Sequence, residues 1–207
     1  MDDNKKFLIV GLGNAEDKYA GTRHNIGFEV VSHLAKSFNA GFSSERYAYA
    51  AHAAFKGRNL IMIMPTTYMN LSGNAVRYWL ALEQIQIENM LVISDDIDLP
   101  VGELRLKPKG GGGSHNGLNH IIETMCTTSF PRLRFGIGKD YAYGYQAEYV
   151  LSKFTSEELP IVNESINTCT ELIKSFVTVG IERTMNFYNT KAKEDNSEKK
   201  TDTAEQK

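Results

Sequence analysis

The sequence predicts an α/β protein of one domain, with a twisted mixed β-sheet covered by helices on both faces. Short apolar runs, such as residues 6–10 and 90–93, are typical of strands buried on both faces. Between such runs, apolar residues recur at helical spacing, as they do in residues 25–38. A turn at residues 56–59 joins two strand-like segments directly, so the sheet is mixed and not wholly parallel.

The strands are predicted from short apolar or alternating runs that end at turn residues. Pro65 ends the third of them, and the segment Leu99-Pro100-Val101-Gly102 has Pro and Gly where a type I turn favours them. A run of four glycines at positions 110–113 follows the fifth strand. The six predicted strands are residues 6–10, 47–55, 60–64, 90–93, 103–107 and 132–137.

The helices are predicted from apolar residues spaced three and four apart. Ser72 is of a residue type that caps helices, and it precedes a periodic segment that runs through Leu82. A third helix passes through Leu118 and Met125. Residues 163–188 form a long helical pattern with a break or kink near Gly180.

Composition bounds the class of protein. Hydrophobic residues make up 42% of the 207 residues and charged residues 23%, which is ordinary for a globular chain. No apolar run approaches the roughly 20 residues of a membrane helix, and the polar start of the chain is unlike a signal peptide. The two cysteines suggest neither a disulfide framework nor a zinc site. We therefore expect a soluble cytoplasmic protein without a membrane partner.

Charge and composition also predict the domain boundary. Residues 191–207 carry five basic and five acidic groups and no large apolar residue, as a disordered polar tail would. The domain is therefore expected to span residues 1–190. The whole chain has 23 basic and 25 acidic residues, a net charge of −2, which disfavours a protein that coats nucleic acid.

Common catalytic motifs are incomplete. Gly11-Leu12-Gly13 follows a strand, but Glu16 stands where a dinucleotide-binding fingerprint needs its third glycine. Lys139 follows a glycine pair but precedes Asp140, whereas a P-loop has Ser or Thr there. No Gly-x-Ser-x-Gly elbow occurs, and the five histidines show no metal-ligand spacing. Nucleotide-dependent enzymes, serine hydrolases and zinc enzymes are thus disfavoured.

Polar clusters follow several of the predicted apolar segments, where an open α/β sheet binds its ligands. A histidine beside a carboxylate there would make a general base with its orienting partner, and asparagines could stabilise an oxyanion. Singly, such residues are more often caps or turn residues. The clusters are Asn14, Arg23-His24-Asn25, Met69-Asn70, Asp95 and His115-Asn116. Residue types alone indicate a possible hydrolase and do not choose among Asp95, Asp96 and Asp98.

Six segments together resemble the bacterial peptidyl-tRNA hydrolase family. They occur in the family's order and cover most of residues 6–188. They are Ile9-Val10-Gly11-Leu12-Gly13-Asn14, Thr22-Arg23-His24-Asn25-Ile26-Gly27, Pro65-Thr66-Thr67-Tyr68-Met69-Asn70-Leu71-Ser72-Gly73, Asp95-Asp96-Ile97-Asp98-Leu99-Pro100, His115-Asn116-Gly117-Leu118 and Arg132-Leu133-Arg134-Phe135-Gly136-Ile137-Gly138.

The resemblance implies a monomeric enzyme that uses no metal or cofactor. It would cleave the ester between a peptide and the 3′ end of tRNA, in peptidyl-tRNAs released from stalled ribosomes. His24 matches the family's catalytic base, Asp95 the carboxylate that keeps it basic, and Asn14 the residue that selects N-blocked substrates. The matches to residues that contact the tRNA 3′ end or the peptide are Tyr19, Tyr68, Met69, Asn70 and Asn116, and Lys107 and Arg134 match basic residues that hold tRNA phosphates.

The chain departs from the family pattern at three places. Ala15-Glu16 replace the usual Pro-Gly, Ser114 replaces a glycine, and Tyr68 stands where Phe is common. Only Ser114 puts a local conformation in doubt, that of the glycine-rich loop. Two other functions stay open: an RNA-binding relative that has lost catalysis, and a small-molecule hydrolase. The first would be expected to lack His24 or Asp95, and the second leaves Lys107 and Arg134 without a role.

Overall fold

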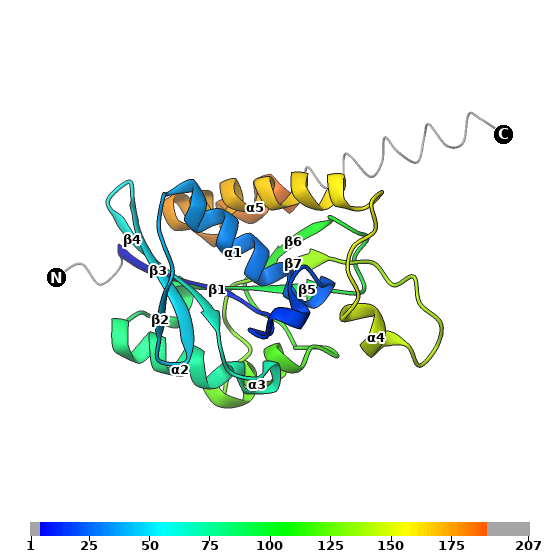
Figure 1. Ribbon diagram of the computed structural model, residues 1–207. Helices are drawn as coiled ribbons and strands as arrows, with labels where there is room; N and C mark the ends of the chain where they lie inside the picture. The colour runs from blue at the N-terminus through cyan, green and yellow to red at the C-terminus, as the bar shows by residue number, and fades with distance from the viewer. Residues whose placement is uncertain (1–4, 190–207) are drawn as a thin grey trace.

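The computed structural model describes residues 5–189, which form a seven-stranded mixed sheet between two layers of helices (Figure 1). The strand order is β2-β3-β4-β1-β5-β7-β6. Strands β4, β1, β5 and β7 are parallel to one another, whereas β2, β3 and β6 add antiparallel edges. The bounds are β1 Lys6–Gly11, β2 Ser43–Glu45, β3 Ala48–Phe55, β4 Arg58–Pro65, β5 Met90–Asp96, β6 Leu104–Lys107 and β7 Arg132–Gly136. The predicted fold class is confirmed.

The helices cover both faces of the sheet. Helices α1 and α5 lie on one face, and α2 and α3 lie on the other (Figure 1). Their bounds are α1 Ile26–Ser37, α2 Ser72–Glu83, α3 Asn116–Met125, α4 Gln146–Val150 and α5 Leu159–Val179. Short 3-10 helices lie between the larger elements of residues 5–189, at η2 Asp17–Tyr19, η3 Arg23–Asn25, η4 Met69–Leu71 and η5 Ile87–Asn89. None of the helices within residues 5–189 is long and apolar enough to span a membrane.

Alternation along the central strands builds two cores. Ile9 of β1 packs into the core beneath α1 and α5, whereas its neighbours Leu8 and Val10 pack into the core beneath α2 and α3. Because both faces are buried, residues 7–10 of β1 and residues 90–93 of β5 are all apolar. This explains why short apolar runs, and not alternating ones, mark the central strands in the sequence.

Close packing at two glycines brings the end of β1 against the start of α1. A Cβ atom on Gly27 would lie 2.5 Å from the backbone nitrogen and oxygen of Leu12, and one on Gly11 would lie 2.2 Å from the Gly27 carbonyl oxygen. Neither position has space for a side chain. The contact places the loop after β1, which carries Asn14, beside η3, which carries His24.

Several local predictions need correction. Ser72 is not the N-cap of α2. Leu71 holds that position, and the Ser72 hydroxyl donates to the Met69 carbonyl at 2.8 Å. The predicted type I turn at residues 99–102 is shifted by one residue, since Glu103 N donates to the Pro100 carbonyl and Gly102 has a φ of 80°. A positive φ at the third residue is typical of a type II turn.

Other element boundaries also differ. Arg58 and Asn59 belong to β4, and the β3–β4 turn is the pair Lys56-Gly57, both with positive φ as a type I′ turn requires. The long C-terminal helix starts at Leu159, ends at Val179 before the break at Gly180, and is followed by helical residues 181–189. The sequence did not predict β2 or α4. The predicted tail, residues 191–207, lies outside the described residues.

Candidate active site

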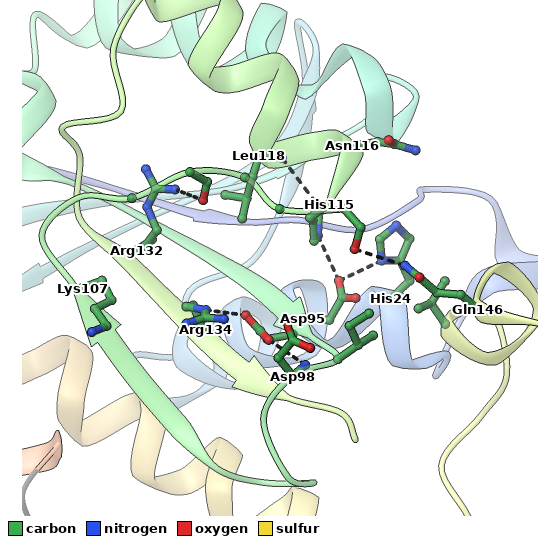
Figure 2. A pocket seen from close by; sticks show the side chains of 18 of the residues that line it. His24, Asp95, Asp98, Lys107, His115, Asn116, Leu118, Arg132, Arg134 and Gln146 are labelled. Carbon is green, nitrogen blue, oxygen red and sulfur yellow. Dashed lines mark hydrogen bonds and ion pairs between the residues drawn. The ribbon is translucent and has the colours of Figure 1, made fainter. Parts of the chain in front are cut away.

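A cleft of about 710 Å³ opens at the carboxyl edge of the parallel strands (Figure 2). The glycine-rich loop, which we define as residues 110–114, forms one wall, and α4 forms the other. Five of the predicted site residues line it together, although each comes from a different segment of the chain. They are His24, Asp95, Lys107, Asn116 and Arg134.

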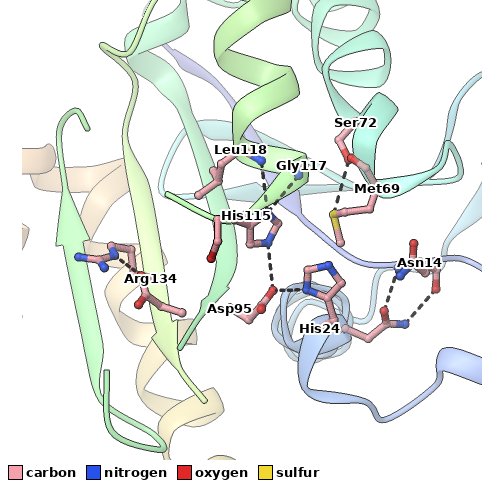
Figure 3. A network of polar contacts seen from close by, with 12 residues as sticks. Asn14, His24, Met69, Ser72, Asp95, His115, Gly117, Leu118 and Arg134 are labelled. Carbon is pink, nitrogen blue, oxygen red and sulfur yellow. Dashed lines mark hydrogen bonds and ion pairs between the residues drawn. The ribbon is translucent and has the colours of Figure 1, made fainter. Parts of the chain in front are cut away.

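The centre of the site is a buried carboxylate shared by two imidazoles (Figure 3). Oδ1 of Asp95, at the end of β5, lies 2.8 Å from His24 Nδ1 and 3.0 Å from His115 Nε2. The Asp95 side chain is only 4% exposed, and the His24 and His115 side chains are 14% and 8% exposed. Of the three acidic candidates, Asp95 is the one hydrogen-bonded to a histidine within residues 5–189.

The hydrogen bonds define the protonation of both rings. His115 is the N-cap of α3, and its Nδ1 accepts from the backbone N–H groups of Gly117 (3.1 Å) and Leu118 (3.3 Å). That nitrogen must be unprotonated, so neutral His115 carries its proton on Nε2 and donates it to Asp95. Asp95 as a carboxylate can only accept, so His24 donates from Nδ1. The neutral His24 ring then has its lone pair on Nε2, to which nothing within residues 5–189 is hydrogen-bonded.

The Asp95 carboxylate is held in its charged form. Burial alone would raise its pKa, because a charge is poorly solvated inside a protein. The hydrogen bonds and charges of His115 and His24 outweigh burial and hold the pKa of Asp95 well below its usual range. The charged Asp95 oxygen accepts from an N–H group of each ring and so fixes the orientation of both imidazoles.

The same three side chains could by donor type hold a metal ion. Within residues 5–189, His24, Asp95 and His115 are the one group whose ligand atoms, all within 4.8 Å of each other, suit that use. These residues are far apart in the sequence and only the fold brings them together, so the spacing of the histidines did not indicate a metal site. Both nitrogens point at one oxygen, and the helix cap fixes the His115 tautomer. Hydrogen bonding thus accounts for the arrangement without an ion.

The backbone of Asn14 is fixed beside His24. The buried Asn25 side chain accepts from Asn14 N at 2.8 Å and donates to Asn14 O at 2.9 Å. The sequence placed Asn25 in the polar cluster next to His24 but did not predict these hydrogen bonds. This reciprocal pair leaves the Asn14 side chain without an intramolecular partner among the described residues.

Arg23, the other neighbour of His24, ties η3 to the wall of the cleft. Its guanidinium forms a bidentate pair with Glu158 at 2.7 and 3.0 Å and lies 4.4 Å from the Tyr149 ring centroid. Tyr149 belongs to α4, whose Gln146 and Val150 line the cleft. The sequence placed Arg23 in a polar cluster but could not reveal this structural role.

The remaining predicted residues lie outside the cleft lining. Met69 is buried beside α3, since a Cβ on Gly117 would lie 2.6 Å from its sulfur. Asn70 is exposed in the same 3-10 helix, η4, and Tyr68 just before it is 72% exposed. Tyr19 is half-buried in η2. Figure 3 shows that Asn14 and Met69 nonetheless lie near His24.

Four basic residues share one face of the β6–β7 ladder. Directly opposed residues lie on the same face, and here Arg105 opposes Arg134 and Lys107 opposes Arg132. Arg134 is ion-paired with Asp96, and Arg105 with Glu103. Lys107 is exposed and has no carboxylate partner within residues 5–189. The cleft is therefore basic on this side although the chain as a whole is slightly acidic.

Ser114 fits the glycine-rich loop without strain. Its φ is not positive, unlike that of Gly113 at 56°. Its hydroxyl accepts a hydrogen bond from Gln146 Nε2 at 3.1 Å, across the cleft from α4. The departure from the family pattern therefore adds a contact between the two walls.

The fold and the site define an α/β enzyme with a histidine–aspartate centre in a basic cleft. A sequence model of the family described as peptidyl-tRNA hydrolase matches residues 8–197. The chain belongs to the peptidyl-tRNA hydrolase family.

Individual relatives agree. The chain is 53% identical over 186 residues to a peptidyl-tRNA hydrolase of Parabacteroides distasonis, covering 90% of this chain and all of that one. It is 52% identical, with the same coverage, to one of Phocaeicola vulgatus. The crystal structure of peptidyl-tRNA hydrolase from Acinetobacter baumannii superposes with a TM-score of 0.83 at 34% identity, covering 88% of this chain and 94% of that one.

The lowered pKa of Asp95 predicts a pH-dependent contribution to stability. Because this pKa is lower in the folded than in the unfolded chain, the contribution is complete above the ordinary carboxyl pKa of about 3.9 and is lost as the pH falls toward the folded value. We expect Asp95→Asn to lower the free energy of unfolding by about 1–3 kcal/mol at pH 7 and by progressively less below about pH 4. Urea denaturation between pH 3 and 7 measures this.

The matched control is Asp98→Asn, which changes an exposed carboxylate three residues further along the chain. Its effect on the free energy of unfolding should be small at every pH. A difference between wild type and Asp95→Asn that stays constant down to pH 3 would contradict the assignment of a stabilised carboxylate.

Proposed function

We propose that this protein hydrolyses the ester bond between a peptide and the 3′ end of tRNA, with His24 as general base and without a metal or cofactor. One observation carries the proposal: Asp95 holds His24 through Nδ1, so Nε2 is available in the cleft. An ester has a good enough leaving group for an activated water, so no covalent nucleophile is needed. Membership of the family supports the choice of substrate.

In the proposed reaction, His24 Nε2 takes a proton from the attacking water. The Asp95 carboxylate stabilises the imidazolium that forms, and His115 keeps the carboxylate in place from its other side. His24 then returns the proton to the leaving 3′ oxygen of the ribose. Asn116, in the first turn of α3, and Asn70 are the amides that would orient the water and the carbonyl or stabilise the oxyanion.

Recognition of the RNA is proposed to separate into two parts. The exposed ring of Tyr68 and the partly exposed ring of Tyr19 offer surfaces on which unpaired bases of the 3′ end could stack. Lys107 and Arg134 would contact phosphates, which report charge and shape but little sequence. Such contacts suit an enzyme that accepts many tRNAs. They also favour an RNA substrate over a small molecule.

Selection of N-blocked substrates is assigned to Asn14, with Met69 lining the same region. The two hydrogen bonds between the Asn14 backbone and the Asn25 side chain fix the Asn14 backbone and leave its side chain free for a ligand. The second candidate function, RNA binding without catalysis, is disfavoured because His24 and Asp95 are both present and hydrogen-bonded.

The test of the proposal is to follow ester loss from N-acetyl-aminoacyl-tRNA and from the unblocked aminoacyl-tRNA. Wild type should hydrolyse the first and spare the second. His24→Ala should lower kcat by about 10²–10⁴-fold, the usual contribution of a general base, while circular dichroism and tRNA affinity stay unchanged. The control His52→Ala removes an exposed histidine of β3 and should leave kcat unaltered. A His24→Ala variant that keeps more than about a tenth of the activity would refute the base.

Phosphate contact predicts a separate effect on binding. Lys107→Ala should raise KM for full-length tRNA substrates, leave kcat unchanged, and reduce the log–log salt slope of binding by about one. Lys107 is the cleaner choice, because removing Arg134 would also leave Asp96 unpaired. Lys36→Ala, an exposed lysine of α1, makes the same change in net charge and should have no effect.

A short substrate that carries only the 3′-terminal nucleotide should be hydrolysed equally by Lys107→Ala and wild type, since it lacks the distant phosphates. If that substrate suffers as much as full-length tRNA, Lys107 acts at the reacting centre and the assignment is wrong.

A further inference from the structure

Arg132, at the start of β7, is a buried cation in the wall of the cleft. Only 2% of the residue is exposed, although it lines the same cavity as His24. Its guanidinium lies 4.0 Å from the Phe130 ring centroid, and its Nε is buried without a hydrogen-bond partner. No carboxylate within residues 5–189 pairs with it. The contacts of this residue are shown in part in Figure 2.

A guanidinium in this place is costly. Charge buried without a partner of opposite sign loses its hydration and gains little in return. Its neighbours make the cost larger, because Lys107 opposes it directly across the ladder and Arg134 lies on the same face of β7. Burial, and then the charge of Arg134, lower the pKa of Arg132 to about 10, so it remains charged at neutral pH. An apolar residue would fill the position at lower cost if packing were its only role.

The two terminal nitrogens of Arg132 bind backbone carbonyls on either side of α3. Nη1 donates to Gly111 O in the glycine-rich loop, and Nη2 donates to Thr128 O after the helix, both at 3.0 Å. Thr128 O also accepts from Gly110 N at 3.1 Å. One side chain thus clamps the start of the loop to the segment that precedes β7.

The hydrogen bond from Arg132 helps to hold the glycine-rich loop in one conformation. Four consecutive glycines have more backbone freedom than any other sequence of that length, and ordering them is correspondingly unfavourable. The loop leads directly into His115 and Asn116, and His115 N donates to Gly112 O at 3.0 Å. Any displacement of the loop therefore moves the imidazole that holds Asp95 and the amide at the first turn of α3.

We propose that Arg132 is a positioning residue, which holds the glycine-rich loop so that His115 and Asn116 stay aligned with His24 and Asp95. Its effect on rate rests on the proposed function, but its effect on the loop does not. The role differs from that of Lys107, whose predicted contact is with RNA. The planar fork of arginine, which reaches two carbonyls at once, is what the position requires, and lysine cannot replace it.

The test uses Arg132→Lys, which keeps the charge, and Arg132→Met, which removes it. Both should lower kcat by about 10–100-fold on full-length tRNA and on the short 3′-terminal substrate alike, because the groups around the reaction are displaced. Hydrogen exchange should become faster at the amides of Gly110 and His115, whose bonds depend on the clamp. If Arg132→Met does not fold, Arg132→Lys decides the question through the same two measurements.

The matched control is Arg58→Lys. Arg58 also binds backbone carbonyls, but away from the cleft: it donates to Val177 O and Thr178 O at the end of α5 and to Lys56 O in the β3–β4 turn. It should lower the melting temperature without changing kcat or exchange in the loop.

Three results would overturn the proposal. The first is unchanged exchange at Gly110 and His115 in Arg132→Lys. The second is a kcat equal to wild type, which would make Arg132 a structural residue only. The third is a rise in KM confined to full-length tRNA, which would make it a phosphate contact. A wild-type protein that fails to hydrolyse N-acetyl-aminoacyl-tRNA would instead refute the proposed function, and the exchange measurement would still decide whether Arg132 holds the loop.

Discussion

A single carboxylate oxygen, Oδ1 of Asp95, accepts hydrogen bonds from two imidazoles, and the positions of the other groups in the cleft depend on that contact. Burying a carboxylate is unfavourable unless its hydrogen bonds are made within the protein. His115 makes one of them. Its other nitrogen caps α3, and because that cap fixes the tautomer, Nε2 carries the proton that is donated to Asp95. His24 makes the second bond. The orientation of the proposed base is therefore built into the packing of β5, η3 and α3.

The scaffold brings these elements to one edge. Strands β1, β5 and β7 are parallel, so the segments that follow them meet at their carboxyl ends, where α/β proteins commonly bind ligands. The absence of side chains at Gly11 and Gly27 lets α1 approach β1 closely enough for Asn25 to bind the backbone of Asn14. The antiparallel partner β6 then extends the sheet beyond β7 and completes the basic face that borders the cleft.

The sequence predicted the fold class and the central strands because burial on both faces leaves a direct apolar signature. It predicted His24 and Asp95 through ordered motifs, and chemistry alone could not separate Asp95 from its neighbours. The three carboxylates differ in where the fold directs their side chains. Asp95 points inward to the histidines, Asp96 pairs with Arg134, and Asp98 is exposed. Ser72 shows the same limit of residue types as predictors. It is a typical capping residue at the start of a helix, but its hydroxyl binds Met69 O and does not cap α2.

Roles that act through backbone carbonyls were not predictable from residue patterns. Arg132 and Arg134 are two positions apart in one motif, yet one is buried against the glycine-rich loop and the other pairs with an acidic side chain. The tautomer of His115 likewise follows from two backbone N–H groups that only the folded helix presents.

The most direct measurement is long-range ¹H–¹⁵N NMR of the histidine rings, recorded at about pH 8, above the ordinary imidazole pKa of about 6.5. We expect His24 to carry its proton on Nδ1 and to have a free Nε2, and His115 to carry its proton on Nε2. A proton on Nε2 of His24, or on Nδ1 of His115, would contradict this expectation.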